Sequence, residues 1–335
     1  MPIAKAVRIK SHGGPEVLAV DRVSVDSPGP GQVLVEVVAA GLNRADLLQR
    51  RGVYPAPAGV APDVPGLEYA GHVAEVGDGV TSFAAGDAVM GIVSGGAMAT
   101  HLVVHEREVI RVPEGLSLVH AAAIPEAFLT AYDALFEQAE LRPGEHALIH
   151  AVGSGVGTAA LALVGLCGAH AIGTSRSEDK LARCAELGLD HGVVVEKGMP
   201  RFANATRELT EGRGADVVLD LVGAAYLAES LDALAPLGRM ILVGLVGGVS
   251  AELSLATVLR KRARIFGTVL RSRPLEEKAA LTQRFARCIA PLFGAAGRLA
   301  PVVDAVMPMS EVQAAHERME RDATFGKIVL TWSTP

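Results

Sequence analysis

The chain has few of the residues that bind structural metals or form disulfides. Its 335 residues include only three cysteines, Cys167, Cys184 and Cys288, which lie far apart. None belongs to a Cys-x-x-Cys pair or to a Cys/His pair at zinc spacing. The histidines His101 and His105 end an alternating HLVVH run, a pattern typical of a strand. The sequence therefore predicts neither a disulfide framework nor a metal site.

Long apolar runs and an excess of basic residues are also missing. Half of the residues are hydrophobic, yet no uninterrupted apolar run approaches the roughly 20 residues that a membrane span requires. The opening MPIAKAVRIK alternates like a strand and lacks the apolar block of a signal peptide. The 31 basic and 37 acidic residues are interspersed and give a net charge of −6. We therefore expect a cytoplasmic protein with no membrane segment and no nucleic-acid partner.

The most informative segment is EHALIHAVGSGVGTAALALVGLCGAHAIGT at residues 145–174. An apolar strand-like run precedes Gly153, Gly155 and Gly157, and Thr158–Cys167 offers a small-residue helix. Such a turn lets backbone N–H groups at the helix start approach a pyrophosphate. The spacing departs from G-x-G-x-x-G, because the last glycine follows the second by two positions. The alternative is a glycine-rich turn that only lets the helix pack closely.

The next strand, His170–Thr174, should end beside the adenosine ribose of a bound dinucleotide. An NAD site usually places an Asp or Glu there, but this chain continues with hydroxyls and cations, including Ser175, Arg176 and Lys180. These residues suit a 2′-phosphate and favour NADPH over NADH. Alternatively, the two cations belong to an ordinary solvated helix start and pair with the acidic residues between them.

The order of the patterns predicts an α/β fold with a Rossmann doubly wound parallel sheet and a β-barrel-like domain. Short alternating runs broken by Pro and Gly fill the first 120 residues, and the pattern turns helical over 118–138. Strand-like and helical runs then alternate to about residue 266. We expect a catalytic domain over 1–122, a nucleotide-binding domain over 123–266 and a segment over 267–335 that returns to the first domain.

Several ordered blocks resemble one family from end to end. They are GPEVL at 14–18, GPGQVLVEV at 29–37, AAGLNRADLLQRRGVYP at 39–55, PGLEYAGHVAEVG at 65–77, AAIPEA at 122–127, SGVGTAA at 154–160 and LRSR at 270–273. The chain resembles the zinc-free quinone oxidoreductase branch of the medium-chain dehydrogenase/reductase superfamily. Its blocks NRADLLQR, AAIPEA, SGVGTAA and LRSR are similar to those of the p53-inducible quinone oxidoreductase subfamily.

The resemblance implies a GroES-like catalytic domain, a Rossmann domain that binds NADPH, an active site in the cleft between them, and a homodimer joined through the Rossmann sheet edges. Zinc-dependent relatives carry a cysteine and a His-Glu pair where this chain has Asn43 and Leu67–Glu68, so the Lewis-acid route is expected to be closed. We expect Glu68 to be a buried structural carboxylate paired with a nearby arginine such as Arg44, rather than a catalytic group. Asp46 is either a helix cap or a site acid, and the cap is favoured.

The same resemblance supplies candidate site residues. Asn43 is expected to orient a carbonyl or the nicotinamide ribose, and Tyr54 to stack on a ring or donate a proton. From its position alone, Tyr54 is equally well a partly exposed aromatic in a Pro-rich loop. The expected cofactor-binding residues are Thr130, Ser154, Gly155, Val156, Gly157, Thr158, Ser175, Arg176, Lys180, Gly244, Leu245, Leu270 and Lys327. The last two could equally serve in packing or as a solvated charge.

We therefore expect an NADPH-dependent quinone reductase that transfers hydride without a metal. Reduction of an activated C=C bond, in an enone or an enoyl thioester, uses the same hydride geometry and is not separated by these residues. A third hypothesis is an NADPH-binding redox sensor or RNA-binding protein with little turnover, although the acidic balance argues against RNA.

Overall fold

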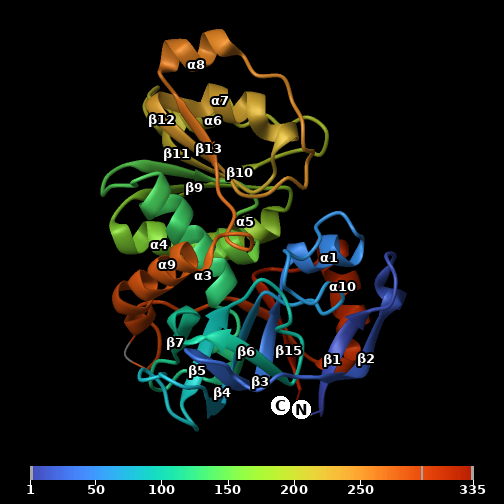
Figure 1. The fold of residues 1–335 in the computed structure, drawn as a ribbon. Helices are drawn as coiled ribbons and strands as arrows, with labels where there is room; N and C mark the ends of the chain where they lie inside the picture. The colour runs from blue at the N-terminus through green and yellow to red at the C-terminus, as the bar shows by residue number, and fades with distance from the viewer. Residues whose placement is uncertain (1–2, 296, 333–335) are drawn as a thin grey trace. The chain divides into compact units, whose positions relative to one another are not determined.

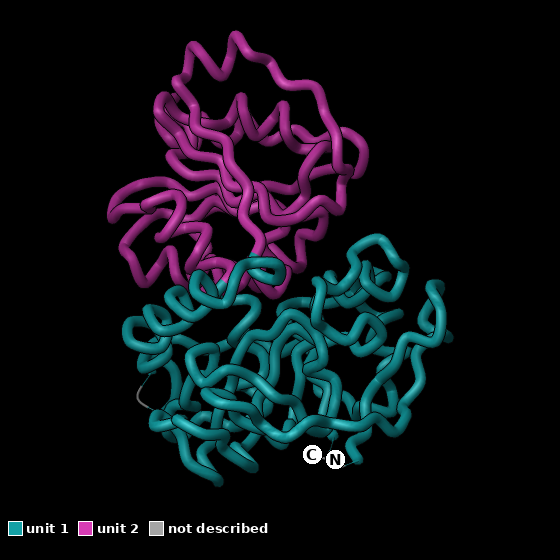
Figure 2. The backbone as a smooth tube through the Cα atoms, viewed as in Figure 1, with its two compact units in different colours: residues 1–129, 270–335 teal, residues 130–269 magenta. Residues whose placement is uncertain are grey.

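The computed structural model describes residues 3–295 and 297–332 and divides the chain into two compact units. Unit 1 comprises residues 1–129 and 270–335, and unit 2 comprises residues 130–269 (Figure 2). The first boundary therefore falls within the helix Pro125–Tyr132, at residue 129 where the sequence predicted residue 122.

Unit 2 contains a six-stranded sheet in which all neighbouring strands are parallel. The strands are β8 (His146–Ile149), β9 (His170–Ser175), β10 (His191–Val194), β11 (Ala215–Asp220), β12 (Leu234–Leu242) and β13 (Arg264–Gly267). They lie in the order β10-β9-β8-β11-β12-β13, so the strand order reverses between β8 and β11. This is the doubly wound topology, in which ligands bind beyond the carboxyl ends of the strands near the reversal. The predicted α/β fold is confirmed.

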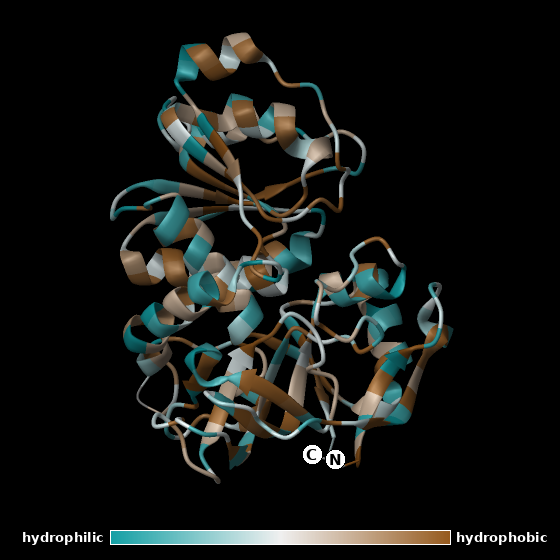
Figure 3. Ribbon diagram, in the orientation of Figure 1, coloured by the Kyte–Doolittle hydropathy of each residue, from teal (hydrophilic) through white to brown (hydrophobic). Residues whose placement is uncertain are grey.

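Helices cover both faces of this sheet (Figure 1). They are α4 (Gly155–Cys167), α5 (Glu178–Glu186), α6 (Ala203–Leu209), α7 (Leu227–Ala233) and α8 (Leu255–Lys261), with a 3₁₀ turn at Ala224–Tyr226. The helices α4 and α5 lie on one face, and α6, α7 and α8 lie on the other. The central strands β8 and β11 carry buried apolar residues because both faces of the sheet are covered, and hydrophobic segments stand out in this sheet in Figure 3. Leu148, Ile172, Val218 and Met240 are completely buried in this core.

The helical segment expected over residues 118–138 is broken into parts. The helix α2 (Leu118–Ala121) ends before Pro125, where α3 (Pro125–Tyr132) begins. Proline has no N–H to donate within a helix, but it is well tolerated as the first helical residue. A π-helical turn, Asp133–Gln138, continues α3 into unit 2. Proline at 125 therefore explains why one helical pattern gives two helices.

Unit 1 is built on a seven-stranded, mainly antiparallel sheet and a separate hairpin. Its strands are β1 (Ile3–Ile9), β2 (Leu18–Ser24), β3 (Gln32–Leu42), β4 (Glu68–Val76), β5 (Ala88–Ile92), β6 (His101–His105), β7 (Val109–Arg111), β14 (Val303–Pro308) and β15 (Lys327–Thr331). The sheet order is β14-β15-β3-β4-β5-β7, with β6 also paired to β3, and β1 pairs with β2. The long strand β3 is therefore the centre of the unit.

The pairing of β15 with β3 joins the two ends of the sequence. Ile328 lies opposite Leu42 in an antiparallel register, and Tyr69 of β4 lies opposite Ala40 on the other side of β3. The start of β15, the end of β3 and the start of β4 therefore come together. Residues separated by almost the whole chain meet at this corner, where the candidate site of unit 1 lies.

Helices and short 3₁₀ turns complete unit 1, which also contains the start of α3. The helices are α1 (Arg44–Arg50), α2, α9 (Leu275–Cys288) and α10 (Val312–Glu320), and the 3₁₀ turns are Pro15–Val17, Glu106–Glu108, Ala290–Leu292 and Met309–Glu311. A buried apolar cluster joins α1 and α10 to the sheet, and includes Leu47, Leu42, Val312 and Ile328. In the described part of the chain, no helix is long and apolar enough to cross a membrane.

Candidate functional site

Most predicted cofactor residues lie at one edge of the parallel sheet in unit 2. The segment Ser154–Thr158 follows β8, Ser175–Lys180 spans the end of β9 and the start of α5, and Gly244 and Leu245 follow β12. In a parallel sheet, the carboxyl ends of all strands lie at the same edge. The strand order reverses beside β8. The structure therefore brings these residues together where a doubly wound fold binds its ligand.

The start of α4 has the features of a phosphate-binding helix end. Ser154 is its N-cap, and the Ser154 hydroxyl accepts a hydrogen bond from the Gly157 N–H at 3.1 Å. In the described chain, the N–H groups of Gly155 and Val156 have no acceptor. Unpaired N–H groups and the helix dipole favour an anion at this end. The residues present fit the pyrophosphate of a dinucleotide.

Close backbone packing explains the glycine at position 157. A Cβ atom there would lie 2.5 Å from the carbonyl oxygens of both Ala151 and Val152. Ala151 itself has a positive φ of 49°, an uncommon conformation for a residue other than glycine. Gly244 is constrained in a similar way, because its Cβ would lie 2.5 Å from the Leu221 oxygen. Both glycines are therefore required by the chain's own packing before any ligand is considered.

The end of β9 carries the residues expected at a 2′-phosphate. Ser175 is buried at the strand end, and its hydroxyl accepts from the Ser177 N–H at 3.1 Å. Ser177 in turn caps α5 by accepting from the Lys180 N–H. Arg176 is exposed and lies near Tyr226, whose pKa is raised by burial although the Arg176 charge lowers it. No carboxylate occupies the strand end, and the first acidic residue is Glu178 on the helix.

The remaining predicted cofactor residues are more dispersed. Thr130 is buried on α3, and Leu245 is half exposed beyond β12. Leu270 belongs to unit 1, where it is buried. Lys327, also in unit 1, is buried within a polar cluster that contains Glu68 and Asn43.

Lys327 forms a buried ion pair at the corner where β15, β3 and β4 meet. Its ammonium lies 2.6 Å from Glu68 Oε1 and donates to Asn43 Oδ1 at 2.6 Å and to the Leu42 carbonyl at 3.0 Å. The side chains of Lys327 and Glu68 are almost fully buried. All three ammonium N–H groups are thus used within unit 1. A buried ion pair of this kind requires such complete hydrogen bonding to offset desolvation.

Asn43 links this pair to α1. Its Nδ2 donates to Glu68 Oε1 at 2.9 Å and to the Gly41 carbonyl at 3.3 Å, and Oδ1 accepts from Lys327. A Cβ atom at Gly41 would collide with Glu68 Oε1, so glycine allows the carboxylate to approach β3. Asn43 is only partly buried.

The expectation that Glu68 pairs with Arg44 is wrong. Arg44 instead forms a largely exposed ion pair with Asp322, with 2.7 Å between Arg44 Nη2 and Asp322 Oδ1. Lys327 takes the place of Arg44 because the pairing of β15 with β3 puts its side chain beside Glu68. This contact joins residues at opposite ends of the sequence, and local patterns contain no signal for it.

Asp46 is a helix-capping residue, as expected. Its Oδ2 accepts from the Asn43 N–H at 2.8 Å, and its Oδ1 accepts from the Gly66 N–H at 2.9 Å. The carboxyl is completely buried, and burial raises its pKa to about 6 although both hydrogen bonds lower it. Both oxygens are therefore occupied in fixing α1 to the loop before β4.

Tyr54 lies against Arg271, a residue that the sequence analysis did not single out. The Arg271 guanidinium is 5.0 Å from the centre of the Tyr54 ring, and Nη1 donates to the Tyr54 carbonyl at 3.1 Å. The guanidinium also donates to the Ser94 carbonyl and to Gln49 Oε1. Within the described chain, the Tyr54 hydroxyl has no hydrogen-bond partner. Arg271 lies in the LRSR block at 270–273, and the resemblance of this block to the family was the only sequence feature that pointed to it.

Glu126 is a second residue that the sequence analysis missed. It stands in the first turn of α3, and its N–H donates to Glu68 Oε2 at 2.8 Å. The partly buried Glu126 carboxyl has no hydrogen-bond or ion-pair partner among the described residues. Burial, and then the charge of Glu68, raise its pKa to about 8. The AAIPEA block contains this residue, but nothing in that block distinguishes it from an ordinary helix-start glutamate.

In the ranges 3–295 and 297–332, no group of three or more His, Cys, Asp or Glu side chains is arranged to hold a metal ion. The three carboxyl groups near Lys327 belong to Asp46, Glu68 and Glu126, and they face two cations, Lys327 and Arg271. A divalent cation would meet positive charge there as well as negative charge.

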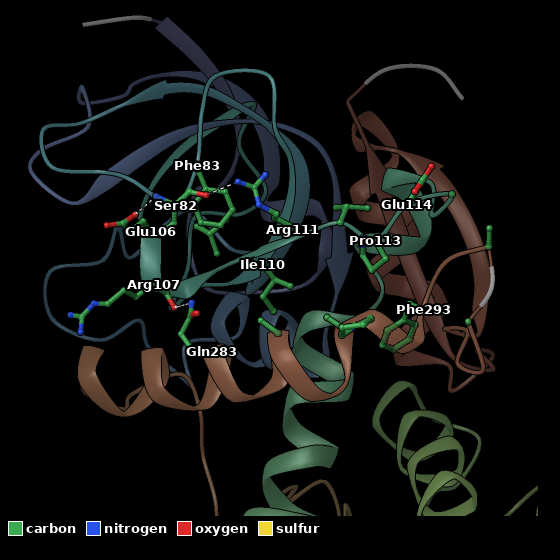
Figure 4. A pocket seen from close by; sticks show the side chains of 18 residues that line it. Ser82, Phe83, Glu106, Arg107, Ile110, Arg111, Pro113, Glu114, Gln283 and Phe293 are labelled. Atoms are coloured by element: carbon green, nitrogen blue, oxygen red, sulfur yellow. Dashed lines mark hydrogen bonds between the residues drawn. The ribbon is translucent and has the colours of Figure 1, made fainter.

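A separate pocket of about 830 Å³ lies in unit 1 between α9 and the strand β7 (Figure 4). Ile110, Pro113 and Phe293 form part of its apolar lining. At its rim, Arg111 lies over the Phe83 ring and donates to the Ser82 carbonyl at 2.5 Å. None of the predicted site residues lines this pocket, so it is distinct from the candidate site.

Two compact units of this kind, one a doubly wound nucleotide-binding sheet and one a mainly antiparallel sheet, define a dehydrogenase architecture. Residues 29–114 match the family described as alcohol dehydrogenase GroES-like domain. Residues 155–287 match the family described as zinc-binding dehydrogenase. The first match lies in unit 1, and the second covers most of unit 2 and part of α9.

Similar proteins refine the assignment. A 2-haloacrylate reductase from Burkholderia sp. is 34% identical over 97% of this chain and 98% of its own length. A quinone oxidoreductase from Pseudomonas aeruginosa is 33% identical over 98% and 99%. The solved structure of mycobacterial Rv1454c with NADPH is 25% identical, with a TM-score of 0.86 over 98% of this chain and 99% of that one. The chain belongs to the quinone oxidoreductase branch of the medium-chain dehydrogenase/reductase superfamily, and it is an oxidoreductase that uses a nicotinamide cofactor.

Proposed function

We propose that this protein is an NADPH-dependent quinone reductase that works without a metal ion. The observation that carries the proposal is the Lys327–Glu68–Asn43 cluster. Two of the positions that hold zinc ligands in zinc-dependent relatives are Asn43 and Glu68 here, and a buried ammonium occupies the oxygens of both. A lysine that neutralises Glu68 leaves no net negative charge to attract a divalent cation. The acceptor must therefore be one that takes a hydride without Lewis-acid activation, as quinones do.

The choice of NADPH rests on the end of β9. Ser175, Arg176 and Lys180 offer a hydroxyl and two cations, and no carboxylate at the strand end is placed to bond a ribose 2′-hydroxyl. Guanidinium and ammonium groups recognise a phosphate by charge-assisted hydrogen bonds. Ser154 and the unpaired N–H groups of Gly155 and Val156 would hold the pyrophosphate. When bound, NADPH supplies the hydride.

In unit 1, Tyr54 and Asn43 orient the reacting groups. Burial raises the pKa of the Tyr54 hydroxyl, which stays protonated and can donate a hydrogen bond to an acceptor carbonyl. Lys327 and Glu68 fix the plane of the Asn43 amide, which would orient a carbonyl or the nicotinamide ribose. Positioning of this kind can supply a large share of the rate of hydride transfer.

Reduction of an activated C=C bond is the second candidate. The similarity to a 2-haloacrylate reductase favours it, because the name of that relative denotes an activated alkene as substrate. The same residues would serve, since a conjugated carbonyl would accept the Tyr54 hydrogen bond in place of a quinone oxygen.

The acceptor is tested by following NADPH and NADH oxidation with ortho- and para-quinones, enones and an acrylyl thioester, before and after exhaustive chelation. We expect oxidation of NADPH by quinones, unchanged by chelation. Turnover confined to alkenes would favour the second candidate, and a loss on chelation that zinc restores would contradict the metal-free mechanism. Tight NADPH binding without turnover would instead indicate a binding or sensor role.

The cofactor preference is tested by changing Arg176 and Lys180 together to Ala. The dissociation constant of NADPH should rise about tenfold or more, because two charge-assisted contacts to the phosphate are lost. The dissociation constant of NADH, which lacks that phosphate, should change by less than about twofold. Isothermal titration of both cofactors gives the comparison, and equal weakening of both would refute the 2′-phosphate role.

We also propose a homodimer formed through the β13 edge of the unit 2 sheet. Three large apolar side chains near that edge, Val249, Leu255 and Leu259, are each at least 74% exposed. Apolar groups of this size are commonly covered by a partner subunit. Light scattering on the purified protein gives its molar mass, and a monomer at micromolar concentration would contradict the proposal.

A further inference from the structure

We propose that the Glu126 carboxyl group donates the proton that completes reduction of the acceptor. This inference rests on the proposed function. It adds a residue to the site, because neither the sequence motifs nor the similarity to relatives assigns Glu126 a role. The geometry that supports it is a carboxyl group without a partner, surrounded by charged groups that all have partners.

The charged groups facing Glu126 come from four other segments. Glu68 of β4, Asp46 of α1, Lys327 of β15 and Arg271 act on its charge, and Tyr54 in the loop after α1 responds to it. Both cations have partners other than Glu126: Lys327 binds Glu68, Asn43 and the Leu42 carbonyl, and Arg271 binds the carbonyls of Ser94 and Tyr54 and the side chain of Gln49. Glu126 therefore has nearby positive charge but no counter-ion of its own.

Glu68, and not Glu126, is the counter-ion of Lys327. Glu68 Oε1 faces Lys327, and Glu68 Oε2 accepts the N–H of Glu126 itself. A second ionised carboxylate in the same partly buried corner would be repelled by the first. The neutral acid is thus the favoured form of Glu126 at neutral pH, in agreement with its pKa of about 8.

The other acids of the corner are unsuited to proton donation. Both Asp46 oxygens accept backbone N–H groups, which favours its ionised form over a donor. Glu68 is committed to Lys327. Burial keeps the pKa of Tyr54 above its ordinary value, so this hydroxyl is a good hydrogen-bond donor but a weak acid. Among the described residues of this corner, Glu126 alone combines an unpartnered acid with a pKa close to neutrality.

Hydride transfer leaves the reduced acceptor one proton short, and Glu126 supplies that proton. An acceptor that takes a hydride gains two electrons and becomes an anion, an enolate or a hydroquinone anion, while NADPH becomes NADP⁺. The anion takes the proton of the Glu126 O–H bond, and the electrons of that bond remain on the carboxylate. Water then returns a proton to Glu126. The sum is acceptor plus NADPH plus H⁺ giving reduced acceptor plus NADP⁺.

The test compares Glu126→Gln with a matched control, Glu277→Gln. Glutamine keeps the size of the side chain but cannot donate a proton as an acid. Glu277 also lies in the first turn of a helix of unit 1, α9, but it is exposed and is not among the charged groups that act on Glu126. NADPH affinity and thermal unfolding, measured for all three proteins, establish that each variant is folded and loaded.

With the acceptor that the panel identifies, Glu126→Gln should lower kcat/KM about 100-fold or more near neutral pH, which is the usual contribution of a general acid. Wild-type kcat/KM should fall above about pH 8, as the acid loses its proton, and this alkaline limb should vanish in Glu126→Gln. Glu277→Gln should retain both the rate and the limb. A Glu126→Gln enzyme with more than about half the wild-type rate and an unchanged limb would overturn the proposal.

A second readout needs no turnover. Because the folded state keeps its proton between the ordinary pKa of 4.5 and about 8, this glutamate makes the native state less stable as pH rises through that window. The free energy of unfolding of Glu126→Gln, relative to wild type, should therefore increase from about pH 5 to about pH 8. If the difference in free energy of unfolding between Glu126→Gln and wild type does not change with pH, Glu126 is not protonated in the native state and the proposal is overturned. Absence of turnover in wild type with every acceptor would instead contradict the proposed function while this pH dependence persisted.

Discussion

The two units bury polar groups in different ways. In unit 2, the completely buried His150 accepts or donates one hydrogen bond on each ring nitrogen, to Thr174 Oγ1 and Ser230 Oγ, both at 2.9 Å. Burial lowers its pKa to about 3, so the ring is neutral. In unit 1, the buried Lys327 and Glu68 form an ion pair. The nucleotide-binding unit thus uses neutral contacts in its core, whereas the other unit fixes its candidate site with opposite charges.

The two candidate sites also differ in how they are assembled. The phosphate-binding features of unit 2 lie within about thirty consecutive residues, from the end of β8 to the start of α5. The cluster of unit 1 combines segments near residues 43, 68, 126, 271 and 327. A local site tolerates changes elsewhere in its unit, whereas a site built from distant segments depends on every strand that brings them together. The following experiments test this contrast.

The largest effect is expected from Lys327→Met. This change leaves the Glu68 carboxylate buried without its cation, and removal of one partner of a buried pair costs about 3–5 kcal/mol. The free energy of unfolding, from denaturant titration, should fall by that amount. Changing Glu68 to Gln in the same protein should restore part of the loss, because no charge then remains buried.

The exposed ion pair of Arg44 with Asp322 provides the control. Arg44→Met should change the free energy of unfolding by less than about 1 kcal/mol, as is usual for surface pairs. Similar losses for Arg44→Met and Lys327→Met would show that burial does not distinguish the two ion pairs.

Substitution of two glycines of α4 by alanine tests the turn of unit 2, because the two changes should shift the free energy of unfolding in opposite directions. Gly157→Ala forces a Cβ against two carbonyl oxygens and should lower the free energy of unfolding by about 1–3 kcal/mol. Gly165 lies in the same helix with open space around its Cα, so Gly165→Ala should raise the free energy of unfolding by up to about 1 kcal/mol. Thermal unfolding and NADPH titration of both variants distinguish packing from ligand binding. Equal effects of the two changes would contradict the close backbone approach at Gly157.

The last experiment measures how the free energy of unfolding depends on pH through the buried, uncharged His150 of unit 2. Below the ordinary histidine pKa of 6.5, the unfolded chain binds a proton that buried His150 does not bind until about pH 3. Stability contributed by His150 is therefore complete above pH 6.5 and is lost as pH falls, by about 1 kcal/mol per pH unit. His150→Asn should reduce this dependence, measured by urea unfolding between about pH 7 and pH 5. His191→Asn, at an exposed position, should leave the dependence unchanged.

Sequence patterns predicted unit 2 well because its signals are local. The apolar runs gave the parallel strands, the glycines marked the start of α4, and the polar residues after Thr174 marked the end of β9. The interruption at Pro125 was missed, because the apolar pattern continues across it. In unit 1, Asp46 was correctly interpreted as a cap, since its partner Asn43 lies three residues away.

The contacts that decide the chemistry of unit 1 were not predictable in this way. Arg44 was chosen as the partner of Glu68 because it is close in sequence, but the pairing of β15 with β3 brings Lys327 there instead. Likewise, the pattern around Glu126 is that of any helix start. Its environment depends on side chains from α1, β4 and β15, whose proximity arises from sheet pairing.

The sequence by itself determined the family, the doubly wound sheet and the position of the phosphate-binding turn, because periodicity and glycine spacing act between near neighbours in the chain. Only the tertiary structure decided which charges are neutralised and which carboxyl remains without a partner. Burial and Coulomb interactions depend on distance in space, and in this protein the decisive distances join residues separated by up to 285 positions.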